Sequence, residues 1–192
     1  PFTLSEDGIE SQFAVNHLGH FYLTKLLRPT LERSEPSRIV VVSSSAHRRG
    51  PSHGVGLTLD AINNEAAYSP PTNYGQSKIA NLLFTRALAK RLADKRVFVN
   101  AIHPGLVATE LVRHYEKYLP DIPAVKRAFQ FVIRLLGFAP EHAVVTQMYA
   151  AVHPDIERND VRGQYYIPLA HEGTPTPLAL DDDLAEQLWT FS

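Results

Sequence analysis

The sequence predicts an α/β fold in which a parallel sheet is flanked by helices. Two short runs, RIVVVSS (38–44) and RVFVNAIHPG (96–105), have the continuous apolar, β-branched character of parallel strands covered on both faces. Helical periodicity precedes the first run at residues 9–31 and the second at residues 73–93. Strands that alternate with helices in this way are typical of a parallel α/β sheet.

Local signals predict where the helices before the two strands begin and what they bury. TLSE at residues 3–6 has the S/T-x-x-E form of a capping box, so the first helix is expected to follow it directly. Its expected apolar face consists of Ile9, Phe13, Leu18, Phe21, Leu26 and Leu31. The second helix follows Pro70-Pro71, runs from about Asn73 to Ala93, and has a buried stripe formed by Ile79, Leu82, Leu83, Leu88 and Leu92.

The remaining segments continue the alternation. Residues 49–71 are rich in Gly, Pro and Asn and are predicted to form a loop with one short turn of helix. Residues 106–138 form an irregular apolar and aromatic stretch. A helix at 140–151, a strand at 163–168 and a terminal helix at 181–191 follow, and the last helix carries acidic residues at its positive end.

Composition excludes several classes of function. The 192 residues fit one domain, and 44% hydrophobic with 20% charged residues is the balance of a folded chain. Lys plus Arg number 19 against 20 for Asp plus Glu, so no basic excess suggests nucleic acid as a partner. The chain has no cysteine, which excludes disulfides, thiolate metal sites and a cysteine nucleophile from it. No signal peptide is visible, and basic residues interrupt the apolar region 122–138, so no transmembrane segment is expected.

Polar residues are expected to gather at one edge of the sheet. In open α/β sheets ligands bind beyond the carboxyl ends of the strands, where the Ser43-Ser44-Ser45 cluster and the Pro104-Gly105 turn fall. YGQSK (74–78) places Tyr74 and Lys78 four positions apart, on one face of a helix. A tyrosine with a pKa of about 10 is a poor base, but a neighbouring ammonium group favours its ionised form. This set could therefore act on a hydroxyl or carbonyl group, with a serine orienting the oxygen.

The order of these motifs resembles that of a known family. Asn16 within NHLGHF, a serine after RIVVVSS, then YGQSK and NAIHPGLVATEL closely resemble the short-chain dehydrogenase/reductase family, in its retinol-dehydrogenase-like and WW-domain-oxidoreductase-like branch. The resemblance covers essentially the whole chain. It implies the C-terminal part of a Rossmann-like doubly wound parallel sheet with flanking helices. Residues 1–192 would form a single domain without the N-terminal nucleotide-binding half, because the family's Gly-rich turn and Asn-Asn-Ala-Gly segment have no counterpart in place.

The resemblance also implies a role for each catalytic candidate. Tyr74 would be the acid/base, and Lys78 would bind the nicotinamide ribose and tune Tyr74. Ser44 would hold the substrate oxygen, with Ser43 and Ser45 as alternatives because successive strand residues alternate in direction. Asn16 would support a water-mediated proton relay toward Lys78.

The implied cofactor is NADP or NAD, and the family residue that distinguishes them follows a strand that this chain lacks. The Pro104-Gly105 turn would run beside the nicotinamide, with the Val107 backbone and the Thr109 hydroxyl near its carboxamide. The apolar stretch 106–138 would form a lid over a lipophilic alcohol or carbonyl substrate, retinoid-like or steroid-like. With its three basic residues the same stretch could instead rest on a membrane surface. Homo-oligomerisation is an expectation by analogy, and the location is left open between the cytoplasm and a membrane facing the cytosol.

Three other readings compete with these assignments. Gly50, Gly54 and Gly56 repeat the G-x-x-x-G-x-G spacing that the family uses in its Gly-rich turn. They do not open a helix, however, so we expect an ordinary loop there. His17 and His20 form H-x-x-H without a carboxylate at ligand spacing, so we expect packed or hydrogen-bonded histidines, as we do for His47 and His103. A non-catalytic interaction or regulatory protein that keeps the fold without binding a dinucleotide is the alternative to an enzyme.

Overall fold

The computed structural model describes residues 1–51, 59–105, 107, 121–123, 125–128, 131, 137 and 140–192. Four strands form one sheet in the order β1-β2-β3-β4. Their bounds are β1 Ser37–Val42, β2 Val97–Ile102, β3 Tyr165–Ile167 and β4 His171–Glu172. The first three strands are parallel, as predicted, and the short β4 is antiparallel to β3. Strand β4 was not predicted from the sequence.

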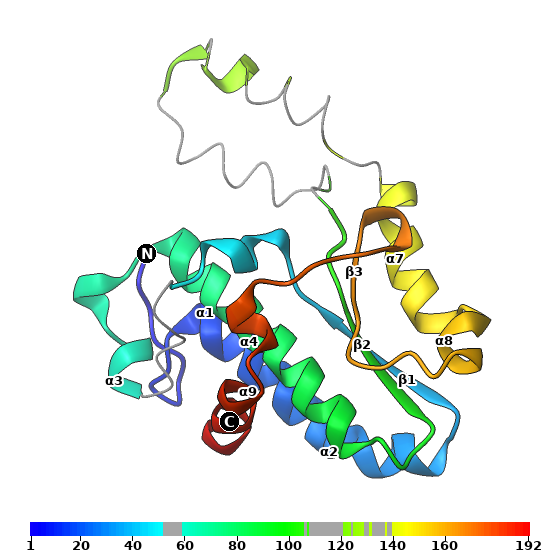
Figure 1. Cartoon of the computed structure of the whole chain (residues 1–192). Helices are drawn as coiled ribbons and strands as arrows, with labels where there is room; N and C mark the ends of the chain where they lie inside the picture. The colour runs from blue at the N-terminus through cyan, green and yellow to red at the C-terminus, as the bar shows by residue number, and fades with distance from the viewer. Residues whose placement is uncertain are drawn as a thin grey trace.

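Helices cover both faces of the sheet, as Figure 1 shows. Helices α2 (Gly19–Arg33) and α4 (Pro70–Arg91) lie on one side, with α9 (Asp182–Phe191) packed against α4. On the other side α7 (Pro140–Val152) crosses β1, β2 and β3 and leads into α8 (Pro154–Arg158). Short helices fill the connections: α1 Ser11–Phe13, α3 Leu59–Ile62 and the 3-10 helices Ser45–Arg49, Glu65–Ala67, Pro168–Ala170 and Pro177–Leu180. None of the helices in the described ranges is long and apolar enough to cross a membrane.

The two long parallel strands differ in burial. Every residue of β2 is buried, as a central strand requires. Strand β1 was predicted to be covered on both faces and to reach Ser44, but it ends at Val42, whose side chain is 46% exposed. The reason is its position: among the described residues β1 has a neighbouring strand on one side only.

The predicted capping box at residues 3–6 is wrong. The chain turns back at Gly8, whose φ of +74° lies in the left-handed region, and Leu4 forms a β-bridge with Glu10. The helix begins at Ser11, and Glu10 caps it by accepting hydrogen bonds from the backbone N–H groups of Gln12 and Phe13. Leu26, expected on the buried face, is 60% exposed.

Between α1 and α2 the helix widens into one π-helical turn, Ala14–Leu18, which contains Asn16. Single π turns inside α-helices are frequent at functional sites because they redirect a side chain or free a carbonyl group. The interrupted first helix therefore presents Asn16 differently from a regular helix.

Helix α4 is the centre of the molecule. Pro70 and Pro71 occupy its first turn, where a missing N–H costs nothing. Its predicted stripe is buried, and so is almost every other residue from Gly75 to Ala89. The burial is this complete because α4 packs against β1 and β2 on one side and against α1 and α9 on the others.

His17 is a packed histidine, as predicted. Asn81 Nδ2 donates to the Val42 carbonyl at 3.1 Å, so Asn81 Oδ1 points at His17 Nδ1, 3.3 Å away. Nδ1 therefore carries a proton, and Nε2 lies 2.9 Å from the Ser192 hydroxyl, which donates to the Leu188 carbonyl at 2.8 Å. Burial lowers the pKa of His17 to about 4.

This burial makes stability depend on pH. Because the folded pKa of about 4 lies below the ordinary 6.5, the unfolded chain binds the proton first as the pH falls. We expect the free energy of unfolding to decrease by about 3 kcal/mol between pH 6.5 and pH 4 on account of His17. Urea unfolding over this range should show that dependence reduced in H17Q but kept in a control, H171Q, at an exposed position. An unchanged pH dependence in H17Q would contradict the assignment.

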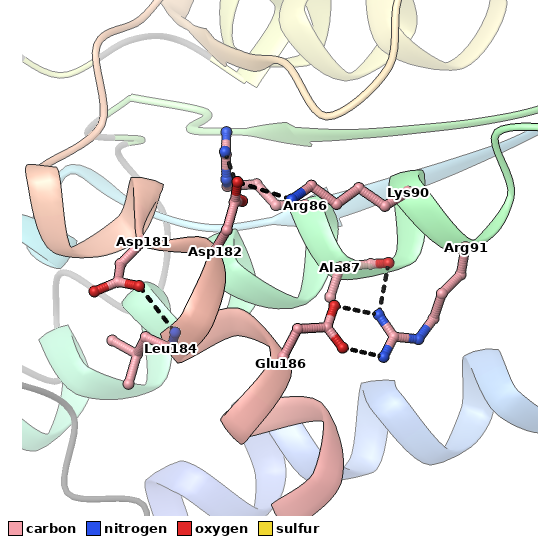
Figure 2. Close-up of polar contacts among 8 residues, drawn as sticks. All are labelled: Arg86, Ala87, Lys90, Arg91, Asp181, Asp182, Leu184 and Glu186. Carbon is pink, nitrogen blue, oxygen red and sulfur yellow. Dashed lines mark hydrogen bonds and ion pairs between the residues drawn. The ribbon is translucent and has the colours of Figure 1, made fainter.

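Charged side chains join α9 to α4 (Figure 2). Asp182 contacts Arg86 and Lys90, each at 2.8 Å, and Glu186 accepts two hydrogen bonds from Arg91. The Arg91 guanidinium also lies 4.0 Å from the centre of the Trp189 ring. Asp181 caps the helix by accepting from Leu184 N, which confirms the predicted acidic start of this helix.

Removing one of these carboxylates should destabilise the docked helix slightly. The Arg91 hydrogen bonds hold the pKa of Glu186 below its ordinary value, so this stabilisation is present above about pH 4.5 and is lost as the pH falls. Because the pair is exposed, E186Q should lower the free energy of unfolding by at most about 1 kcal/mol at neutral pH. Urea unfolding of E186Q beside E6Q, at an exposed residue outside this cluster, measures the difference. An equal loss in both variants would refute the contribution of the pair.

Candidate active site

The carboxyl ends of β1 and β2 lie side by side. Val42 pairs with Ile102, and the next residue, Ser43, donates its N–H to the Ile102 carbonyl at 2.8 Å. The serine cluster and the Pro104-Gly105 turn therefore meet at one edge of the sheet, as predicted.

Helix α4 is attached to this edge through Lys78. The buried Ser43 hydroxyl donates to the Lys78 carbonyl at 2.8 Å. In the opposite direction the Lys78 ammonium donates to the Val42 carbonyl at 3.3 Å. Together these bonds hold one turn of α4 against the carboxyl end of β1. The Ser43 hydroxyl is therefore engaged in a buried hydrogen bond.

Tyr74 and Lys78 face each other on α4. The Lys78 ammonium lies 5.4 Å from the centre of the Tyr74 ring. Only 8% of Lys78 is exposed, and burial lowers the pKa of its ammonium group. Tyr74 itself is partly exposed at the start of the helix, so a phenol and a largely desolvated cation share one face.

Ser44 begins the 3-10 helix Ser45–Arg49 with an extended backbone. Its side-chain oxygen accepts a hydrogen bond from the N–H of Ala46 at 3.1 Å, in the manner of a helix cap. Ser44 is partly exposed, unlike the buried Ser43, and Ser45 is exposed. Because an oxygen that accepts from Ala46 keeps its own proton, the Ser44 hydroxyl can donate to a further acceptor.

Two glycines let this 3-10 helix touch α4 closely. A Cβ atom on Gly75 would lie 2.6 Å from the nitrogen of Gly50 and 2.7 Å from the carbonyl oxygen of Ala46. No side chain fits there, and the backbone next to Tyr74 lies against the segment that follows Ser44. Gly50 thus has a packing role, while Gly54 and Gly56 of the same G-x-x-x-G-x-G spacing lie outside the described residues.

Asn16 reaches the site through Ser77. Its side-chain N–H donates to the Ser77 hydroxyl at 3.0 Å, and that hydroxyl donates to the Tyr74 carbonyl at 2.8 Å. The backbone carbonyl of Asn16 lies 3.0 Å from His20 Nδ1. The role of Ser77 was not predicted from the sequence, although it stands inside YGQSK, one helical turn after Tyr74.

The predicted cofactor-binding residues are only partly described. Gly105 has a φ of +91°, which requires glycine, and its N–H donates to His103 Nδ1 at 3.3 Å. The N–H of His103 in turn donates to the Tyr166 carbonyl at 2.7 Å, so the turn is tied to β3. Val107 is partly exposed just beyond the turn. Thr109 lies outside the described residues.

The donor groups at this edge fit a cofactor rich in oxygen acceptors. The Lys78 ammonium has three N–H groups and forms one long bond to Val42, so it has donors to spare beside the Tyr74 phenol. No three His, Asp or Glu side chains among the described residues come together as a metal site would require. The arrangement suits proton transfer at a hydroxyl or carbonyl oxygen.

Comparison with known proteins identifies relatives of this chain. The family model for enoyl-(acyl carrier protein) reductase matches residues 49–131. Retinol dehydrogenase 14 of Homo sapiens is 42% identical over 192 residues, which cover 100% of this chain and 54% of the relative. Short-chain dehydrogenase TIC 32 A, chloroplastic, of Brassica napus is 42% identical over 199 residues, covering 100% and 58%. A solved structure from Mycobacterium paratuberculosis matches with a TM-score of 0.68 at 32% identity, covering 100% of this chain and 60% of that one.

The chain belongs to the short-chain dehydrogenase/reductase family, as its motifs predicted. It is homologous to NAD(P)-dependent enzymes of that family and is similar to retinol dehydrogenases. It spans about half the length of the curated relatives it matches.

A side chain at position 75 should disturb the site. In G75A the new methyl group would clash with backbone atoms of Ala46, Arg49 and Gly50, which cannot rotate away. We expect a loss of about 1–3 kcal/mol in the free energy of unfolding. Thermal unfolding measures it, with G19A as the control because its methyl group would meet only Ala14 O at 3.5 Å. If G75A were as stable as G19A, the close contact would not constrain the site.

Proposed function

We propose that this chain carries the catalytic residues of an NAD(P)-dependent oxidoreductase that interconverts an alcohol and a carbonyl compound. The single observation that carries the proposal is the pairing of Tyr74 with the buried Lys78 at the carboxyl ends of the strands. The family to which the chain belongs supports it. The nicotinamide cofactor supplies or accepts the hydride when it is bound.

Each residue of the site would have one task. Tyr74 exchanges a proton with the substrate oxygen, and the ammonium group of Lys78 stabilises the phenolate that this exchange produces. Ser44 donates a hydrogen bond from its hydroxyl to the same oxygen and keeps its proton, since its own oxygen already accepts from the Ala46 N–H. Ser43 is less suitable, because it is buried and its hydroxyl is bound to the Lys78 carbonyl. Asn16, which donates to the Ser77 hydroxyl on α4, would support a water-mediated proton relay toward Lys78.

The cofactor would be held by only a few residues of this chain. Lys78 would bind the ribose beside the nicotinamide, and the Pro104-Gly105 turn, Val107 and Thr109 would border the nicotinamide itself. In the part of the chain that the structure describes, no Gly-rich turn leads from a strand directly into a helix in the way that holds a pyrophosphate. Residues 1–192 would form one domain, and the pyrophosphate would be bound by residues outside them.

The substrate would be lipophilic. Retinol dehydrogenase 14, at 42% identity, is named for an apolar alcohol, and we extend that substrate class to this chain. In the expected lid, Phe131 is 65% exposed, which suits an apolar ligand or an apolar surface. Phe129, Leu135, Leu136 and Phe138 of the same stretch lie outside the described residues.

Replacing the acid/base is the direct test. In the full-length gene product, Y74F should lower kcat for reduction of a lipophilic carbonyl by at least about 100-fold, because the proton donor is lost. Oxidation of NADPH and of NADH, followed by absorbance, measures it. Y68F is the matched control, since Tyr68 lies elsewhere and accepts from Gln12. Turnover that survives in Y74F would sink the proposal, and absence of turnover in the wild type would favour the non-catalytic alternative.

A further inference from the structure

His47 is bound to the candidate serine by its side chain. It stands three residues after Ser44, on the 3-10 helix, and only 1% of it is exposed. Its Nδ1 lies 2.6 Å from the Ser44 carbonyl oxygen, and its backbone N–H donates to the same oxygen at 3.1 Å. One carbonyl group thus accepts two hydrogen bonds from one residue.

The geometry determines which ring nitrogen carries the proton. A carbonyl oxygen can only accept, so Nδ1 must be the donor. Burial lowers the pKa of His47, which keeps the ring neutral and leaves Nε2 unprotonated. Nε2 is buried and has no hydrogen-bond partner among the described residues. The ring meets Tyr165 edge to face, with their centres 5.4 Å apart.

The bonded carbonyl group controls where the Ser44 hydroxyl lies. The Ser44 peptide is held on its carbonyl side by His47, and its side-chain oxygen is held by the N–H of Ala46. Ser43, directly before it, is anchored to β2 and to α4. The ring of His47 is the side chain among these restraints that bonds directly to the Ser44 peptide, so a substitution of His47 removes this restraint.

We propose that His47 is a positioning residue that fixes the Ser44 backbone through its Nδ1–H bond and so aims the Ser44 hydroxyl at the substrate oxygen. The inference rests on the proposed function, because His47 can be a positioning residue only for a reaction in which Ser44 takes part. His47 does not touch the substrate. A histidine that merely filled the core would show no preference for one ring nitrogen over the other.

Substitution of His47 by asparagine or by glutamine distinguishes a positioning role from a packing role. The side-chain amide of asparagine places an N–H near the Nδ1 position, whereas that of glutamine places it near Nε2. In the full-length gene product, H47N should therefore keep kcat within the same order of magnitude as wild type. H47Q should lower kcat by about 10-fold to 100-fold, because small displacements of a catalytic group have effects of that size. KM for NADPH or NADH should be unchanged in both, since Ser44 does not bind the cofactor.

A spectroscopic measurement keeps the inference testable if the variants do not fold. The ¹⁵N chemical shifts of the wild-type His47 ring should show a protonated Nδ1 and an unprotonated Nε2. The opposite tautomer, or an active wild type with equal kcat in H47N and H47Q, would overturn the positioning role alone. A wild type without any turnover would overturn the proposed function and, with it, the catalytic meaning of this contact.

Discussion

The attachment of helix α4 to the carboxyl end of β1 is the constraint on which the site depends. Lys78 forms it twice, through its carbonyl, which accepts from Ser43, and through its ammonium group, which donates to Val42. The contact between Gly75 and Gly50 closes the same junction without side chains. Since the α4 backbone cannot move away from the strand, Tyr74 and Lys78 keep their place beside the serines.

The same junction explains why neighbouring serines have different roles. Ser43 is buried and its hydroxyl donates to the Lys78 carbonyl, whereas Ser44 is partly exposed and its side-chain oxygen accepts from the Ala46 N–H. Neighbouring positions of an extended chain point in opposite directions, so adjacent hydroxyls differ in role by geometry alone. The 3-10 helix that follows places the His47 ring against the Ser44 carbonyl, which it holds by a hydrogen bond.

Apolar side chains remain exposed on both sides of the β1 edge. They lie on α2, on α7 and at the end of the strand itself: Leu23, Leu26, Leu27, Val144, Met148, Val152 and Val42. In an α/β sheet such faces are normally covered by a neighbouring strand and its helices. Because no strand lies beyond β1 among the described residues, the predictions of a fully covered β1 and of a buried Leu26 were wrong.

The alternation of helices and strands, the parallel character of the sheet and the buried stripe along α4 could be predicted from the sequence, because each is indicated by the apolar pattern of continuous segments. The facing pair Tyr74 and Lys78 followed from one helical turn. Only the tertiary structure decided that Glu10 caps the first helix, that Ser77 links Asn16 to α4, and that the Ser43 hydroxyl is buried. Most of these features join residues dozens of positions apart, and even the local cap depends on the turn at Gly8, so the folded chain as a whole determines them.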